Sequence, residues 1–148
     1  MSKVEVRMFN DFNCFEVSYG KELAIRIRNN RKAIALAVDV GRDSTNLCFI
    51  THGSGSNDSL IESIKGGKFE DIANFVKAIL SVAKPEKLYL DSIAYGMALW
   101  DYILPYLVEN NIYVSKDGTV SYNLSREEFV TKVNNEGNRI YERAFKSQ

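Results

Sequence analysis

The sequence predicts a single α/β domain with a mixed β-sheet, and three observations lead to this prediction. The first 32 residues alternate apolar and polar side chains with a period of two, which is typical of antiparallel strands with one solvated face. Residues 33–38 form an unbroken apolar run, as expected for a strand buried on both faces. From residue 69 onward, helical and strand patterns alternate, which favours crossover connections within one sheet. A chain of 148 residues matches one such domain, 1–148.

The N-terminal segment predicts a small antiparallel β meander. Its apolar alternations lie at residues 4–8, 15–17 and 23–27, and polar or glycine-containing turns separate them. We therefore expect an N-terminal β extension over residues 1–32, followed by the core of the domain over residues 33–146.

The core begins with a predicted hairpin. The apolar run 33–38 ends in the turn Asp39-Val40-Gly41-Arg42-Asp43-Ser44-Thr45, and a second strand is predicted over 47–50. His52 to Asp58 is rich in Gly, Ser and Asn, which predicts a loop. Residues 60–64 predict a third strand.

Two helices with a strand between them follow in the pattern. Apolar residues at helical spacing predict a helix over 69–83, which Pro85 ends. A short strand over 88–90 ends at Asp91. The next helical stripe runs over 96–107 and contains a proline at position 105, which is expected to kink or split the helix.

The C-terminal part predicts one more strand and one more helix. Residues 112–114 predict the strand, and Asp117-Gly118 predicts the turn after it. Ser125 and Glu128 have the spacing of a capping box, which predicts a final helix that continues to Phe145. The whole order predicts a mixed sheet with helices on both faces, and it is the order of the RNase H-like fold.

Composition excludes some classes of function. The 19 basic and 19 acidic residues give a net charge of zero, so nucleic acid would be bound through a local basic patch or a bridging metal. Cys14 and Cys48 lack the spacing of a zinc site or a disulfide framework. The first residues lack the apolar core of a signal peptide, and no apolar run approaches the ~18 residues of a membrane span. We therefore expect a cytoplasmic protein without a membrane partner.

Two aspartates are the best candidates for chemistry. Asp39 ends the most apolar strand and Asp91 ends the other short core strand, so both are expected at the strand ends where open α/β sheets bind ligands. Close carboxylates repel each other unless a cation neutralises them, and Mg²⁺ or Mn²⁺ prefers such oxygen ligands. Two ions ~4 Å apart would clamp a phosphodiester. The alternatives are that Asp39 stabilises the hairpin turn and that Asp91 caps the following helix.

The two segments that carry these acids resemble the nuclease domain of phage terminase large subunits, which belongs to the RNase H-like nucleases. The likeness rests on Ala37 to Thr45, with its Asp-x-Gly turn, and on Leu88 to Leu99, where a strand ends in an acid before a Gly-containing helix start. The resemblance implies a metal-dependent DNA endonuclease with Asp39 and Asp91 as metal ligands and Asp43 as an accessory acid. It also implies a third essential acid, for which Glu136 is the candidate, with Asp117 and Glu142 as weaker options.

The sequence departs from that family in lacking the Gly-rich phosphate loop of its ATPase motor. The chain is thus either an excised nuclease domain or a stand-alone relative, and a separate ATPase motor or another packaging protein is a possible partner. A catalytically inactive scaffold that binds nucleic acid or a packaging partner is the main alternative function. An actin-like ATPase ranks behind it, because such proteins need two domains of this kind around the nucleotide.

Weaker candidates remain beside the acids. His52 is the single histidine and lies in the predicted loop. Arg26, Arg28, Arg31 and Lys32 form a basic cluster, which is either a solvated strand face or a phosphate-binding patch.

Overall fold

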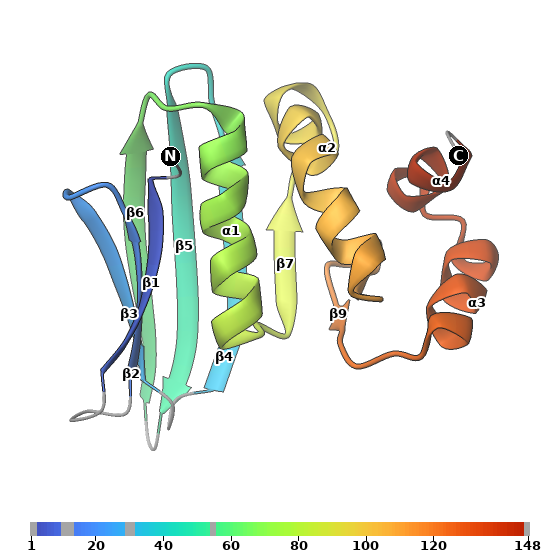
Figure 1. Ribbon diagram of the computed structural model, residues 1–148, viewed down its shortest axis with the longest axis horizontal. Coiled ribbons are helices and arrows are strands. Elements are labelled where there is room, and N and C mark those ends of the chain that lie inside the picture. The colour runs from blue at the N-terminus through green and yellow to red at the C-terminus, as the bar shows by residue number, and fades with distance from the viewer. Residues whose placement is uncertain (1–2, 10–13, 29–31, 54–55, 147–148) are drawn as a thin grey trace.

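The computed structural model describes residues 3–9, 14–28, 32–53 and 56–146. It confirms a mixed α/β architecture in which an antiparallel meander precedes a mixed sheet flanked by helices (Figure 1). No helix in these ranges is both long and apolar enough to cross a lipid bilayer.

The meander forms a sheet of its own. It consists of β1 (Val4–Phe9), β2 (Cys14–Tyr19) and β3 (Leu23–Arg28), paired antiparallel in that order. Its apolar side chains at 23, 25 and 27 are buried and alternate with exposed ones, as the period-two pattern predicted. The buried face packs on α1 (Phe69–Ala83), where the rings of Tyr19 and Phe75 meet edge to face 6.0 Å apart.

The main sheet has four strands in the order β6-β5-β4-β7. These are β4 (Lys32–Val40), β5 (Ser44–Gly53), β6 (Ser56–Lys65) and β7 (Lys87–Leu90). The first three form an antiparallel meander, and β7 runs parallel to β4. The strand that ends near Asp39 therefore lies beside the strand that ends near Asp91, as predicted.

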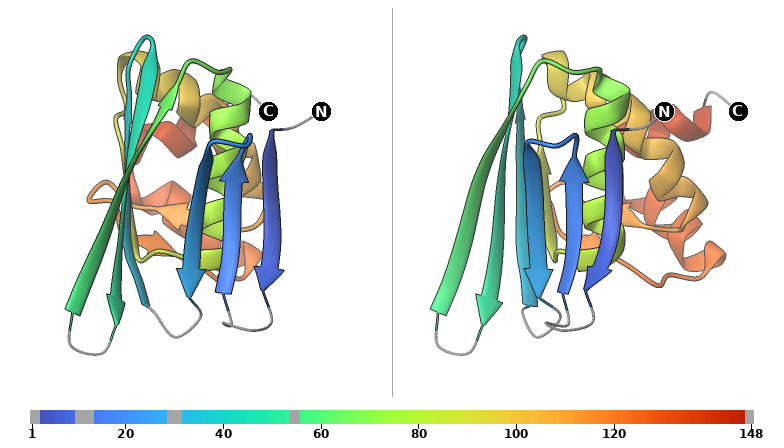
Figure 2. Two further views of the ribbon diagram at one scale, coloured as in Figure 1. Left: turned by 90° about the vertical axis from the view of Figure 1, so that its left-hand side faces the viewer. Right: turned by 60° about the vertical axis from the view of Figure 1, so that its left-hand side comes forward.

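Helices cover one face of this sheet. Figures 1 and 2 show α1 and α2 (Ala94–Glu109) across that face, with the β1–β3 meander standing beside α1. α2 is apolar on nearly all sides, and it buries Leu99, Trp100 and Ile103 against α1 and the sheet. The prediction of helices on both faces is wrong. α3 (Arg126–Glu136) and α4 (Arg139–Lys146) lie beyond β7 at the edge of the sheet.

The far edge of the sheet also differs from the predicted order. β8 (Tyr113–Val114) and β9 (Val120–Ser121) form a separate two-stranded sheet, and Thr119 makes a single antiparallel bridge to β7 at Lys87. The segment that runs antiparallel beside β7 is therefore the one that leads into β9, not β8. The strand predicted over 112–114 is therefore one position removed from the main sheet.

Three other predictions need correction. The expected loop at His52 to Asp58 is part of a long β5–β6 ribbon whose tip, residues 54–55, lies outside the described residues. The capping box at Ser125 is confirmed at the start of α3. The expected single final helix is two helices, because Gly137 adopts a left-handed φ of 61° and ends α3. Pro105 does not split α2, since it lies on the exposed side, where water can hydrogen-bond the carbonyl that its missing N–H leaves free.

Candidate functional site

The two predicted acids lie next to each other at one end of the sheet. Val38 on β4 is the parallel partner of Leu90 on β7, so Asp39 and Asp91 each follow one residue beyond that pair. Neighbouring strands are ~4.8 Å apart, and residues in register point to the same face. That face is the one opposite α1, because Val38 is buried in the core whereas Asp39 and Asp91 are exposed.

Neither acid has the structural role that would explain it otherwise. The residue that caps α2 is Ile93, and it makes no side-chain capping hydrogen bond, so Asp91 is not an N-cap. The β4–β5 turn is closed by the Gly41 amide, which donates to the Ser44 carbonyl at 2.8 Å without help from Asp39. Within the described part of the chain, no hydrogen bond or ion pair engages either carboxylate. Two adjacent acids are thus held without neutralising partners.

Asp91 is held in place by the start of α2. A Cβ at Gly96 would approach the Asp91 carbonyl oxygen to 2.3 Å and its Cβ to 2.9 Å, so only glycine lets the helix pass this close. The indole Nε1 of Trp100 donates to the Leu90 carbonyl at 3.2 Å and ties the helix to the end of β7. These contacts fix the backbone that carries the carboxylate.

The link between Asp91 and α2 is strained. Ala94 adopts a left-handed φ of 53°, a region that costs an L-residue about 1–2 kcal/mol. Residues held in such conformations cluster at functional sites, where the surrounding structure enforces them.

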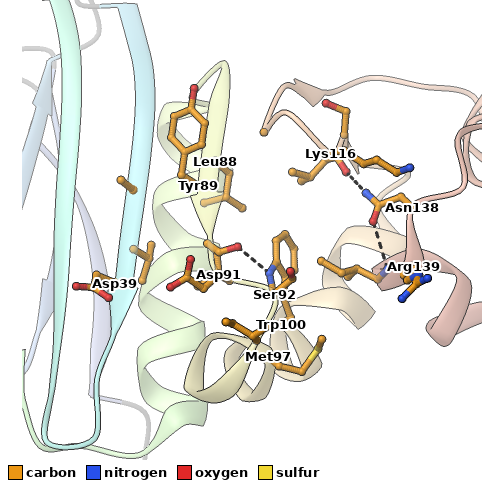
Figure 3. A pocket seen from close by; sticks show the side chains of 18 of the residues that line it. Asp39, Leu88, Tyr89, Asp91, Ser92, Met97, Trp100, Lys116, Asn138 and Arg139 are labelled. Atoms are coloured by element: carbon orange, nitrogen blue, oxygen red, sulfur yellow. Dashed lines mark hydrogen bonds between the residues drawn. The ribbon is translucent and has the colours of Figure 1, made fainter.

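A cleft of about 970 Å³ opens beside the acids. Figure 3 shows its two sides: Asp39, Tyr89 and Asp91 come from the sheet, and Lys116 and Arg139 come from the β8–β9 turn and the start of α4. The size is that of a pocket that takes a small ligand or a nucleotide. Its lining includes Val38 and Leu88 from the covered face of the sheet as well as Asp39 and Tyr89.

The C-terminal wall of the cleft is rigidly attached to β8. Asn138 lies at the junction of α3 and α4, and its amide donates to the Val114 carbonyl at 2.9 Å. The buried Tyr141 hydroxyl accepts from the Val114 amide at 2.8 Å and donates to the Ile112 carbonyl at 2.9 Å. Asn138 and Tyr141 therefore satisfy backbone groups of Ile112 and Val114.

Cations line this wall. Arg143 is engaged by Asp101, 3.3 Å away, and by the Met97 sulfur. Lys116 and Arg139 have no ion pair within the residues that the structure describes. The cleft thus has two acids on its sheet side and, on the opposite wall, two cations that form no ion pair with the described residues.

The other predicted acids lie outside the cleft lining. Asp43 is exposed in the β4–β5 turn, where its carbonyl accepts from the Gly66 amide at 2.8 Å. Glu136 ends α3 and pairs with Lys132 at 3.6 Å. Burial, reinforced by the charge of Glu136, raises the pKa of Tyr113 to about 12, and neither residue lines the cleft.

The weaker candidates are also accounted for. The Asp117 carboxylate accepts from the Ser115 hydroxyl and from the Thr119 amide, and these bonds lower the pKa of Asp117 to about 2, as expected for a turn residue. Glu142 lies on α4 and, like His52 on β5, is not among the residues that line the cleft.

The described members of the basic cluster are exposed side chains on β3 and β4. Arg26 pairs with Glu16 at 2.9 Å, and Lys32 pairs with Glu86 at 2.8 Å. Arg28 is exposed on β3, and Arg31 lies outside the described residues. None of the described members lines the cleft.

The donor set fits a hard divalent cation in part. Mg²⁺ is commonly held by one or two carboxylates together with water and substrate phosphate, and Asp39 and Asp91 supply two. Among the described residues, no group of three or more His, Cys, Asp or Glu side chains is arranged around a common point. The protein's own ligands therefore match one ion better than a closed two-metal site.

Comparison of the chain with protein-family models, with curated proteins and with solved structures gave no significant match.

Proposed function

We propose that this protein is a metal-dependent DNA endonuclease of the RNase H-like class. The observation that carries the proposal is the pair of unpartnered carboxylates, Asp39 and Asp91, at the ends of neighbouring parallel strands. A cation bound between carboxylates on these neighbouring strands would offset their mutual repulsion. The cleft beside them, with Lys116 and Arg139 on its far wall, suits an anionic substrate.

The arrangement of the main sheet supports the RNase H-like assignment. A three-stranded antiparallel meander followed by a parallel fourth strand beside the first, β6-β5-β4-β7, is the order that the sequence motifs imply. The far edge departs from it, since β8 does not join β7 and Thr119 occupies that place instead. The proposal therefore rests on the half of the sheet that carries the acids.

Each part of the cleft has a task in this proposal. A bound Mg²⁺ or Mn²⁺ would neutralise the acids and polarise both the phosphodiester and an attacking water. Asp39 and Asp91 would hold the ion, and Asp91 is kept in position by the close packing of Gly96. Lys116 and Arg139 would attract the phosphate backbone. We keep Asp43 and Glu136 outside the ligand set because neither lines the cleft.

One observation favours a second candidate, an RNase H-like scaffold without catalytic activity. In the described ranges, the cleft lining contains two acids and lacks the third that the resemblance implies. Such a scaffold would bind nucleic acid or a packaging partner, such as a separate ATPase motor, through the same face. Activity measurements separate the two candidates.

The test is plasmid nicking by the purified protein in Mn²⁺, with EDTA as the metal-free control. The parent should nick, and Asp39→Asn should abolish nicking while leaving the fold intact, because it removes a ligand charge and nearly keeps the shape. Asp43→Asn is the matched control, since it makes the same change four residues away outside the cleft, and it should retain activity. Full activity in Asp39→Asn would exclude the proposed site. A parent that is inactive in metal on several substrates, single-stranded DNA as well as plasmid, would favour the scaffold.

A further inference from the structure

An exposed aromatic ring lies on the open sheet face beside the proposed metal site. Tyr89 lies on β7 and precedes Asp91, which directly follows the strand, by two residues, a spacing that places both on the same side of an extended chain. The side chain of Tyr89 lines the cleft and is 45% exposed. It forms no aromatic pair, cation–π contact or hydrogen bond with the other described residues. A large aromatic side chain is thus presented to solvent within reach of the acids.

The position of this ring is defined by its neighbour. Gly118 has a φ of 90°, and a Cβ there would approach the Tyr89 Cε1 atom to 2.8 Å and its Cδ1 atom to 3.0 Å. The Cδ1–Cε1 edge of the ring therefore packs against the β8–β9 turn, and the side chain also borders the cleft. An aromatic ring supported in this way can accept a stacked base at little cost in side-chain entropy.

Charge near the ring is limited and local. Lys116 is two residues from Gly118 in the same turn, and its amine reaches the neighbourhood of Gly137 across the wall of the cleft. The chain has no net charge, and Lys116 and Arg139 are the uncommitted cations of the described cleft lining. This amount of charge suits one or two phosphates rather than the row of phosphates that a duplex-binding surface neutralises.

We propose that the open sheet face binds a single-stranded nucleic acid, with one base stacked on Tyr89 and the adjoining phosphate near Lys116. The inference rests on the proposed nuclease function and specifies its substrate class. In a duplex, the faces of the bases are already stacked on each other, so they cannot lie on Tyr89 unless the strands open. Stacking on an aromatic ring next to a short basic patch is how proteins bind single strands without reading their sequence.

Binding is measured separately from cleavage. Fluorescence anisotropy with a labelled oligothymidylate and with a duplex of equal length, in EDTA and at low salt, reports affinity without turnover. The parent should bind the single strand more tightly than the duplex. Tyr89→Leu should weaken single-strand binding by about 5- to 150-fold, the loss of one base–aromatic stack. Tyr89→Phe should bind within about twofold of the parent, because the ring is kept.

Two further variants complete the test. Tyr102→Leu is the matched control, since Tyr102 is equally exposed at 45% but lies on α2 outside the cleft lining, and its loss should leave binding unchanged. Lys116→Gln should reduce the slope of log affinity against log salt by about one.

Three results would overturn the proposal: no binding of oligothymidylate by the parent, equal or tighter binding of the duplex, or undiminished binding in Tyr89→Leu with its melting temperature preserved. Each can occur whether or not the parent nicks plasmid in Mn²⁺. Failure of this inference is therefore distinguishable from failure of the proposed nuclease function.

Discussion

The two faces of the main sheet differ in what their side chains do. On β6, Ile64 is 3% exposed and packs in the core, whereas Ile61 on the same strand is 75% exposed on the opposite face. On β4, Leu36 and Val38 are buried beneath the helices, while Asp39 is exposed on the other face. One face thus provides the stability of the fold.

We propose that the open face serves binding, since side chains there such as Ile61 and Tyr89 are not part of the core. Parallel strands are normally covered on both faces, but here the β4–β7 pair is covered by helices on one face only. The other face carries two acids, an exposed aromatic ring and a cleft. Residues there can be chosen for chemistry, since changing them leaves the core intact.

The largest predicted effect tests this difference between the faces by replacing isoleucine with alanine at two positions of β6, one on each face. Ile64→Ala should destabilise the protein by about 2–5 kcal/mol, because it leaves a cavity in a packed core. Ile61→Ala should change the free energy of unfolding by no more than about 0.5 kcal/mol. Urea unfolding of both variants gives the comparison, and equal losses would mean that the second face is covered in solution.

The second prediction concerns the charge on the open face. Mn²⁺ binding only to the folded protein should stabilise it by about 2.7 kcal/mol at a hundredfold excess over the dissociation constant. Asp91→Asn should raise the stability of the metal-free protein slightly, by removing repulsion from Asp39, and should reduce the response to Mn²⁺. Melting curves with and without metal measure both effects.

The control for that experiment is Asp117→Asn. It removes a carboxylate that serves the β8–β9 turn and does not line the cleft, so the response to Mn²⁺ should persist. A parent protein whose melting temperature ignores millimolar Mn²⁺ would contradict the metal site.

The third prediction concerns the wall that borders the open face. Tyr141→Phe removes the hydroxyl that pairs with the Val114 amide and the Ile112 carbonyl, and it should cost about 1–3 kcal/mol because those buried groups lose their partner. Tyr102→Phe, on the exposed side of α2, should be neutral. Urea unfolding of the two variants, compared with the parent, measures the difference. A neutral Tyr141→Phe would mean that α4 contributes little to the attachment of this wall.

Much of the fold follows from local patterns in the sequence. The apolar run at 33–38, the helical stripe at 69–83 and the capping box at Ser125 each specify an element that the structure contains. The position of Asp39 and Asp91 at strand ends was equally predictable. These features depend on the residues themselves and their immediate neighbours.

The errors arise where tertiary contacts decide. The β5–β6 ribbon extends through a Gly- and Ser-rich segment because strand pairing overrides low β propensity. The error at the C-terminus is of another kind, because its signal is local. Gly137-Asn138 is typical of a helix end followed by a new cap, whereas the apolar spacing around it predicts one continuous helix. The contacts of Tyr89 with Gly118 and of Tyr141 with residues 112–114 depend on which distant segments meet, and no local pattern specifies that.

The smallest predicted effect concerns the short connection from Asp91 to the start of α2. Ala94 adopts a left-handed φ of 53°, and replacing it by glycine removes strain of about 1–2 kcal/mol. The greater freedom of glycine in the unfolded chain offsets about 0.4–1 kcal/mol of this. Ala94→Gly should therefore raise the free energy of unfolding, by up to about 1.6 kcal/mol. Ala98→Gly, the same change within the same helix, should lower it by about 1 kcal/mol. The opposite signs are the test, and urea unfolding of both variants measures them. Equal losses would mean that α2 begins without strain, and the position of Asp91 would then depend on the packing of Gly96 and Trp100 alone.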